Sequence, residues 1–170
     1  QLDGKTIELR TEGTGKIVIN ATADLEDHDF AGVTHDSGST NNVELNVSNN
    51  LNLTTKDLGA VEAFAISTGE LTISESQLKN SSGAGSIVVL VSADSSTDFA
   101  ATLALSLGSN ETVQFTENST FTGDFGNSNI LIDSTKTLTV TSDKLDGKTS
   151  SLSGAGNITL TDTATTDIDA

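Results

Sequence analysis

The sequence predicts an all-β protein, and more specifically a β-solenoid (parallel β-helix) of about seven coils of roughly 20 residues each. Two observations carry this prediction. Short segments such as LTIS at 71–74 and LTVT at 138–141 alternate apolar and hydroxyl side chains, which is the period of a strand with one buried face. A pattern built on such segments also recurs along the chain at a nearly constant interval, as a stack of similar coils requires.

The recurring pattern is an aliphatic residue, an apolar or small residue two positions later, and a Leu or Phe five or six positions after that. Its copies are Ile17-Ile19-Leu25, Leu51-Leu53-Leu58, Leu71-Ile73-Leu78, Val91-Ala93-Phe99, Val113-Phe115-Phe121 and Leu138-Val140-Leu145, and Ile158-Leu160 begins a further one. From Leu51 onward the copies start 20 to 25 residues apart. The spacing predicts one strand of this kind in each coil.

Residues 1–170 are expected to form a single β-rich domain, because a chain of this length has room for one core. The longer gap between the first two copies holds a polar insertion, or an irregular coil, at about 26–42. The tetrapeptide SGAG, at 82–85 and again at 153–156, predicts tight corners in which Gly takes positive φ. The nearest candidate for a helix is 98–107, although its three Leu residues alternate as in a strand.

Stacking these coils predicts two ladders of apolar side chains in the core. The first ladder consists of Leu51, Leu71, Leu138 and Ile158, and the second of Leu58, Leu78, Phe99, Phe121 and Leu145. The alternative fold is a β-sandwich of the jelly-roll, pilin-like type, which also uses many short strands joined by turns. A sandwich does not require one residue pattern to recur at a constant interval, so the solenoid is favoured.

Composition and charge exclude several classes of function. The formal charge of −16 repels phosphate backbones, so no nucleic-acid partner is expected, and no apolar run approaches the length of a membrane span. The chain has no Trp or Tyr and a single Arg, Arg10, whereas sugar-cleaving solenoid enzymes present aromatic and basic side chains to their substrate. No GxSxG motif is present. We therefore expect no enzyme and assign no catalytic residues.

The densest polar cluster of the sequence is the acidic loop at 24–36. Its candidate metal ligands are Asp24, Glu26, Asp27, His28, Asp29, His35 and Asp36. Carboxylates suit Ca²⁺, and two imidazoles beside carboxylates suit Zn²⁺. The spacing fits no defined metal motif, however, and a solvated insertion loop is the favoured explanation. No cofactor is assigned, and Ca²⁺ is the candidate ion. A second acidic group, Asp162, Asp167 and Asp169, is a candidate for sharing a cation at a subunit junction, although solvated terminal residues are the favoured explanation.

Threonines alternate along two segments near the C-terminus. They are Thr137, Thr139 and Thr141 in one repeat and Thr159, Thr161, Thr163 and Thr165 in the next. Stacked on an outer face, they would form a flat ladder like that of ice-binding solenoids, whereas ordinary β-propensity on a solvent face is the alternative. Segments such as LNLTTK at 51–56 do not keep the pattern.

The phrase LTVTSDKLDGKTSSLSGAGNITLTDT at 138–163 resembles the degenerate repeats of large secreted bacterial surface proteins, including adhesins and surface-layer-like proteins. The resemblance implies an extracellular or cell-surface location and a structural or adhesive role. Its pentapeptide LDGKT, at 145–149, also occurs at 2–6, where it has no strand before it, so the chain is expected to start and stop within a coil. The expected partners are therefore copies of the chain itself or flanking repeats of a longer polypeptide. A binding module that uses the acidic loop at 24–36 is the alternative.

Overall fold

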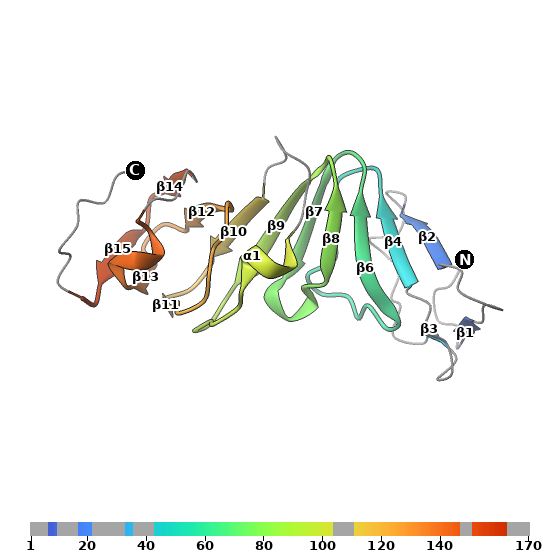
Figure 1. Cartoon of the computed structure of the whole chain (residues 1–170), viewed down its shortest axis with the longest axis horizontal. Helices are drawn as coiled ribbons and strands as arrows, with labels where there is room; N and C mark the ends of the chain where they lie inside the picture. Colours follow the sequence, from blue (N-terminus) through green and yellow to red (C-terminus); the bar gives the residue numbers. More distant parts are fainter. Residues whose placement is uncertain are drawn as a thin grey trace.

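The computed structural model describes residues 7–9, 17–21, 33–35, 43–103, 111–146 and 151–162, and it confirms the β-solenoid with about six turns. Its strands lie side by side along the long axis of the molecule, from β2 (Ile17–Ala21) to β15 (Asn157–Leu160) (Figure 1). Some turns are longer than the expected 20 residues, since Ser95 pairs with Phe121 and Ile17 pairs with Val43. Longer turns explain why there are fewer than the roughly seven coils that the sequence predicts.

Strands from successive turns pair in parallel in each described sheet. The four-stranded sheet has the order β2, β4 (Val43–Val47), β6 (Val61–Ile66) and β8 (Asn80–Gly83). The six-stranded sheet has the order β14 (Leu152–Gly154), β12 (Asn129–Ile132), β10 (Glu111–Phe115), β9 (Ser86–Val91), β7 (Glu70–Ser74) and β5 (Leu51–Asn52). The three-stranded sheet has the order β11 (Ser119–Thr120), β13 (Thr137–Val140) and β15, and a further pair joins β1 (Ile7–Leu9) to β3 (Val33–His35).

The chain alternates between these sheets. It passes from the four-stranded sheet to the six-stranded sheet at β4–β5, β6–β7 and β8–β9, and later from the six-stranded to the three-stranded sheet at β10–β11, β12–β13 and β14–β15. Short 3₁₀ turns, η2 (Glu75–Gln77) and η3 (Ser142–Lys144), follow β7 and β13. The single helix in the described part, α1 (Phe99–Thr102), follows β9.

The core consists of the inward positions of these strands. In β4, β9 and β12 every second residue is buried, as the alternation in the sequence predicts. Each Val, Leu or Ile that is fully buried in this way contributes about 1.5–3 kcal/mol to folding. The interval at 26–42 contains β3, which pairs with β1, and the remainder of that interval lies outside the described residues.

The structure corrects the first predicted ladder. Leu51 pairs with Leu71 in the six-stranded sheet, whereas Leu138 pairs with Ile158 in the three-stranded sheet, so the four residues form two separate pairs. The next partner of Leu71 is Ile87, sixteen residues away, and not Val91. The cause is that each turn contains several alternating strands, and the recurring pattern matched a strand of one sheet to a strand of another.

Residues of the second predicted ladder all lie in or against the core. Leu58, Phe99 and Phe121 are buried, and Leu78 and Leu145 are half-buried and pack against the buried cluster. The rings of Phe99 and Phe121 stack with centroids 5.9 Å apart. This aromatic group, which also includes Phe115 and Phe125, fills the core beside α1.

The SGAG corners have the backbone that the sequence predicts. Gly83 has φ of 123° and Gly154 has φ of 101°. A Cβ at Gly83 would lie 2.0 Å from the carbonyl oxygen of Ile66, and one at Gly154 would lie 2.1 Å from that of Ile132. Glycine is therefore required at both corners, because the corner of one turn rests directly on the backbone of the turn before it.

The described part of the segment at 98–107 begins with a helical turn in place of a strand. Asp98 accepts a hydrogen bond from the backbone N–H of Ala101 (2.9 Å) and so caps the one-turn helix α1. Leu103 then forms a bridge with Ser81 of β8 and is buried, while 104–107 lie outside the described residues. An Asp at the N-cap, which alternation alone does not weigh, accounts for the difference.

Polar side chains at the corners join each turn to the next. The side-chain oxygens of Asn50, Asn118 and Asn129 accept hydrogen bonds from the backbone N–H groups of residues 70, 137 and 151 of the following turn. The Glu75 carboxylate accepts from the hydroxyls of Ser95 (2.5 Å) and Thr97. These bonds fix the register of the turns, since alternation alone leaves a shift by two residues open.

Candidate functional site

The C-terminal end of the described solenoid carries a partly uncovered core. Five inward positions stack in one column across the six-stranded sheet, in the order Ile73, Val89, Val113, Ile130 and Leu152. The side chains of the first three are 0% exposed and Ile130 is 2% exposed, but Leu152 is 49% exposed. The column therefore ends in an apolar side chain that points toward the core and whose one neighbour in the described sheet is Ile130.

The three-stranded sheet shows the same change at the same end. Phe121 and Val140 are each 1% exposed, whereas Leu160, which pairs with Val140 in β15, is only half-buried. Ile158 pairs with the fully buried Leu138 and is also half-buried. At β14 and β15, both sheets thus leave inward-facing apolar side chains partly exposed. These two strands lie at one end of the molecule (Figure 1).

The strand edges at this end are also directed outward. β14 and β15 are the last strands of their sheets, and no described strand pairs with their outer sides. The N–H groups of Asn157 and Thr161 donate to Lys136 and Val140 in the preceding turn. Since the N–H groups of a parallel strand alternate in direction, those of Ile158 and Leu160 point away from β13. A row of such groups is a template for a further strand.

The metal ligands predicted in the acidic loop at 24–36 fall outside the described residues, with one exception. Only the backbone of His35 is described, and it pairs with Leu9 at the end of β3. In the described ranges no three His, Asp or Glu side chains gather as a metal site requires. The metal site at this loop therefore remains a prediction.

Asp162 is the one described member of the predicted C-terminal acid group, as Asp167 and Asp169 lie outside the described residues. Its carboxylate accepts from the hydroxyl of Ser142 (2.7 Å) and from the backbone N–H of Ser142 (2.8 Å). These bonds lower the pKa of Asp162 from its ordinary value of 3.8. The structure thus assigns Asp162 a role in fastening the last turn to η3.

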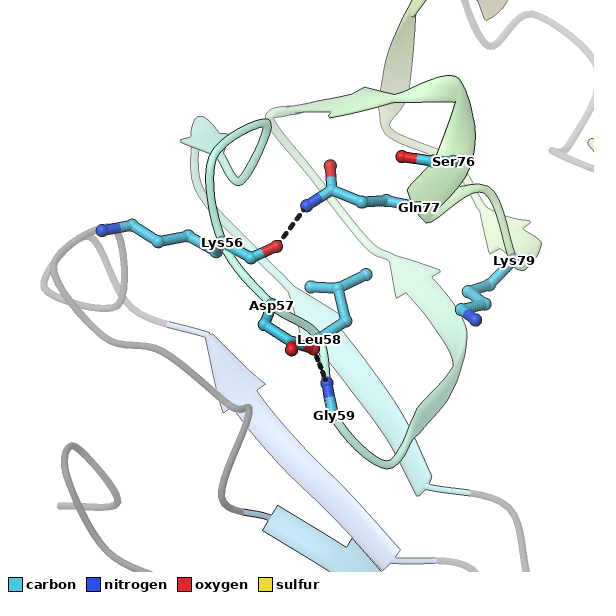
Figure 2. Close-up of a pocket in the computed structure, with 7 residues that line it drawn as sticks. All are labelled: Lys56, Asp57, Leu58, Gly59, Ser76, Gln77 and Lys79. Atoms are coloured by element: carbon cyan, nitrogen blue, oxygen red, sulfur yellow. Dashed lines mark hydrogen bonds between the residues drawn. The ribbon is translucent and has the colours of Figure 1, made fainter.

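A hollow of about 260 Å³ lies between the 56–59 loop and η2 (Figure 2). Its central polar group is the Gln77 amide, which donates to the carbonyl oxygens of Leu53 (2.5 Å) and Lys56 (2.6 Å) and accepts from the N–H of Ser74. The Asp57 carboxylate accepts from the N–H of Gly59. Because these groups already bond within the loop, the hollow is best explained as a packing feature of the corner.

Threonines of successive turns stack on the outer side of the three-stranded sheet. Thr139 pairs with Thr159, as the predicted ladder requires, whereas Thr137 pairs with Asn157. Thr163 and Thr165 lie outside the described residues. Sequence reasoning missed Thr120, which pairs with Thr139 from the other side, and Thr122, two positions further along. The repeated Thr-x-Thr triplets at 120–122, 139–141 and 159–161 are the signal that finds them.

Comparison of the chain with protein-family models, curated proteins and solved structures finds no match. None of the helices in the described ranges has the length and apolar character needed to cross a membrane.

Proposed function

We propose that the chain is a structural module of an extracellular surface fibre, matrix filament or adhesin, in which further β-coils continue the solenoid across its β14–β15 end. The observation that carries this proposal is the exposure of Leu152 at the end of a column whose other four members are buried. The added coil would be another copy of this chain or a flanking repeat of a longer polypeptide.

Two kinds of contact would join such a coil. Its inward side chains would cover Leu152, Ile158 and Leu160, and its backbone would pair with the outward groups of β14 and β15. Burying the exposed half of a Leu and the exposed parts of two further aliphatic side chains contributes a few kcal/mol, on the scale of about 25 cal/mol for each Å² of apolar surface. A hydrogen bond between corner side chains, like that from Ser142 to the Asp162 carboxylate, would also fix the register of the added coil.

The acidic composition makes the proposed association dependent on divalent cations. A surface with a formal charge of −16 keeps single molecules apart through repulsion, which divalent cations relieve. We therefore expect association of the coils to increase in Ca²⁺ and to decrease in a chelator.

Electron microscopy and light scattering of the purified chain, over a range of concentrations and with Ca²⁺ or a chelator, test self-assembly directly. We expect filaments or end-to-end oligomers for the natural sequence and their loss in Leu152→Lys. Leu131→Lys is the matched control, because Leu131 lies in the adjacent strand β12 and points outward from the same sheet. A natural chain that stays monomeric at every concentration, both in Ca²⁺ and in chelator, would rule out assembly between copies.

A chain extended by one artificial coil at the β15 end tests the alternative of flanking repeats. We expect the unfolding free energy to rise. We also expect slower hydrogen–deuterium exchange at the backbone N–H of Leu152 and less surface labelling of its side chain. An extended chain no more stable than the natural one, combined with a monomeric natural chain, would remove the structural proposal as a whole.

A further inference from the structure

The three-stranded sheet displays an array of threonines in two columns on its outer side. The first column is Thr120, Thr139 and Thr159, and the second is Thr122, Thr141 and Thr161. Hydrogen bonds from the N–H of Phe121 to the Thr139 carbonyl (2.9 Å) and from the N–H of Thr161 to the Val140 carbonyl (3.1 Å) continue the ladder beyond the strands. All six threonines are exposed or half-buried.

Buried side chains hold the backbone that carries the array. Between the two threonines of each triplet lies an inward residue, which is Phe121, Val140 or Leu160 in the three turns. Phe121 and Val140 are 1% exposed, so the backbone that carries the threonines is held in place by packing. Because β-branched side chains are restricted at χ1, the hydroxyl and methyl groups of each Thr are also held in a narrow range of positions.

The spacing of the array follows from strand geometry. Strands of successive turns lie about 4.8 Å apart, and residues two apart in one strand lie about 6.6 Å apart. Six Thr side chains therefore form an array with a similar repeat in each turn. The array stops at Asp94, whose neighbour Ser95 pairs with Phe121 and whose carboxylate accepts from the N–H of Thr120 (2.7 Å).

The chemistry of the array restricts its ligand. Its six side chains are uncharged, so the array itself offers no charge to pair with an ionic ligand. The chain has no Trp or Tyr to stack on sugar rings. Hydroxyls and methyls at fixed, repeating positions instead match a neutral surface that presents hydrogen-bonding oxygens at repeating positions.

We propose that this threonine array is an ice-binding face, whose ligand is a crystal plane of ice. The hydroxyls would bond to ordered waters, and the methyl groups would lie in the spaces between them. This inference is independent of the structural role, because it uses the side of the solenoid and not its β14–β15 end. An association through Leu152 and an ice-binding face on the outer side of the sheet can each hold without the other.

The test is inhibition of ice recrystallisation and shaping of a single ice crystal by the purified chain. We expect the natural sequence to slow recrystallisation and to shape the crystal. We expect Thr139→Lys to abolish both effects, because it places a long charged side chain at the centre of the array. Thr72→Lys is the matched control, since Thr72 is a half-buried, outward-facing strand Thr of the six-stranded sheet, and it retains both effects.

Circular dichroism checks that each variant folds. Should Thr139→Lys unfold, Thr159→Lys replaces it, because Thr159 is exposed and lies in the last strand of its sheet. A natural chain without any effect on ice would overturn the proposal. A folded array variant that acts on ice as well as the natural chain would also overturn it, since the active surface would then lie elsewhere.

Discussion

The middle and the C-terminal end of the six-stranded sheet use the same kind of residue in different surroundings. Val89 and Leu152 occupy the same column of inward positions, yet Val89 is 0% exposed and Leu152 is 49% exposed. Val89 has a turn on each side, whereas Leu152 has one described neighbour, Ile130. In a solenoid the burial of a side chain therefore depends on two adjacent turns as well as on its own alternation.

The largest expected effect comes from placing a charge at these two positions. Val89→Asp removes a buried side chain that contributes about 1.5–3 kcal/mol and adds an unpaired buried carboxylate, so it should consume most of a stability of about 5–15 kcal/mol. Leu152→Asp should cost only about 1 kcal/mol, because half of the side chain already meets water. Denaturant unfolding of both variants measures the difference, and equal costs would contradict the assigned column.

The two SGAG corners allow the same comparison for the backbone. Gly83→Ala and Gly154→Ala each force positive φ on a residue with a Cβ and bring that Cβ within 2.0–2.1 Å of a carbonyl oxygen. We expect Gly83→Ala to cost about 2–4 kcal/mol, from strain of about 1–3 kcal/mol and the clash together. Gly154→Ala should cost less, since the last strand can move outward. Thermal unfolding measures both, and a larger cost at Gly154 would be inconsistent with a free-standing end.

Much of this fold is predictable from local sequence, and the assignment of strands to sheets is not. Alternation identifies β4, β7 and β13, and the SGAG tetrapeptides identify two corners, because these signals depend on backbone geometry within a few residues. The ladder through Leu51, Leu71 and Leu138 was wrong, because every strand of every turn alternates in the same way. Which strand joins which sheet depends on the number of residues in each turn, and that number varies because some turns are longer and one contains the helix α1.

The candidate sites were predictable to different degrees. Thr139 and Thr159 follow from alternation within one strand, but Thr120 does not, because β11 is two residues long and offers no alternation of its own. Leu152 was not predicted as a site at all, since a Leu at an inward position indicates core. Only the register of β14 against β12 reveals that, among the described strands, this position has a neighbour on one side.

Removing a side chain that hydrogen-bonds one turn to the next should have an intermediate effect on stability. Glu75, in the middle of the molecule, is the test. Glu75→Ala removes the acceptor of the Ser95 and Thr97 hydroxyls, and hydrogen bonds to a charged group contribute about 1.5–3 kcal/mol each when they are buried. Since these groups are partly exposed, we expect a total loss of about 1–2 kcal/mol. Glu117→Ala, which breaks the exposed Glu117–Lys136 ion pair (2.6 Å), is the control and should cost less than about 1 kcal/mol. The unfolding free energies of the two variants measure this difference. A larger cost for Glu117→Ala would exclude Glu75 as a residue that fastens one turn to the next.

The smallest effect on stability is expected at the β14–β15 end, where the Asp162 carboxylate accepts hydrogen bonds from Ser142. The pKa of Asp162 lies below 3.8 in the folded chain, so the folded state favours the carboxylate. Its contribution to stability is present above that value and is lost as the pH falls through the lowered pKa. In Asp162→Ala the unfolding temperature should therefore fall slightly at neutral pH, and the difference from the natural chain should disappear in strong acid. Asp143→Ala, which removes an exposed carboxylate from the same corner, controls for net charge. If the difference in unfolding temperature between Asp162→Ala and the natural chain did not change with pH, the charge of Asp162 would not be what fastens this end.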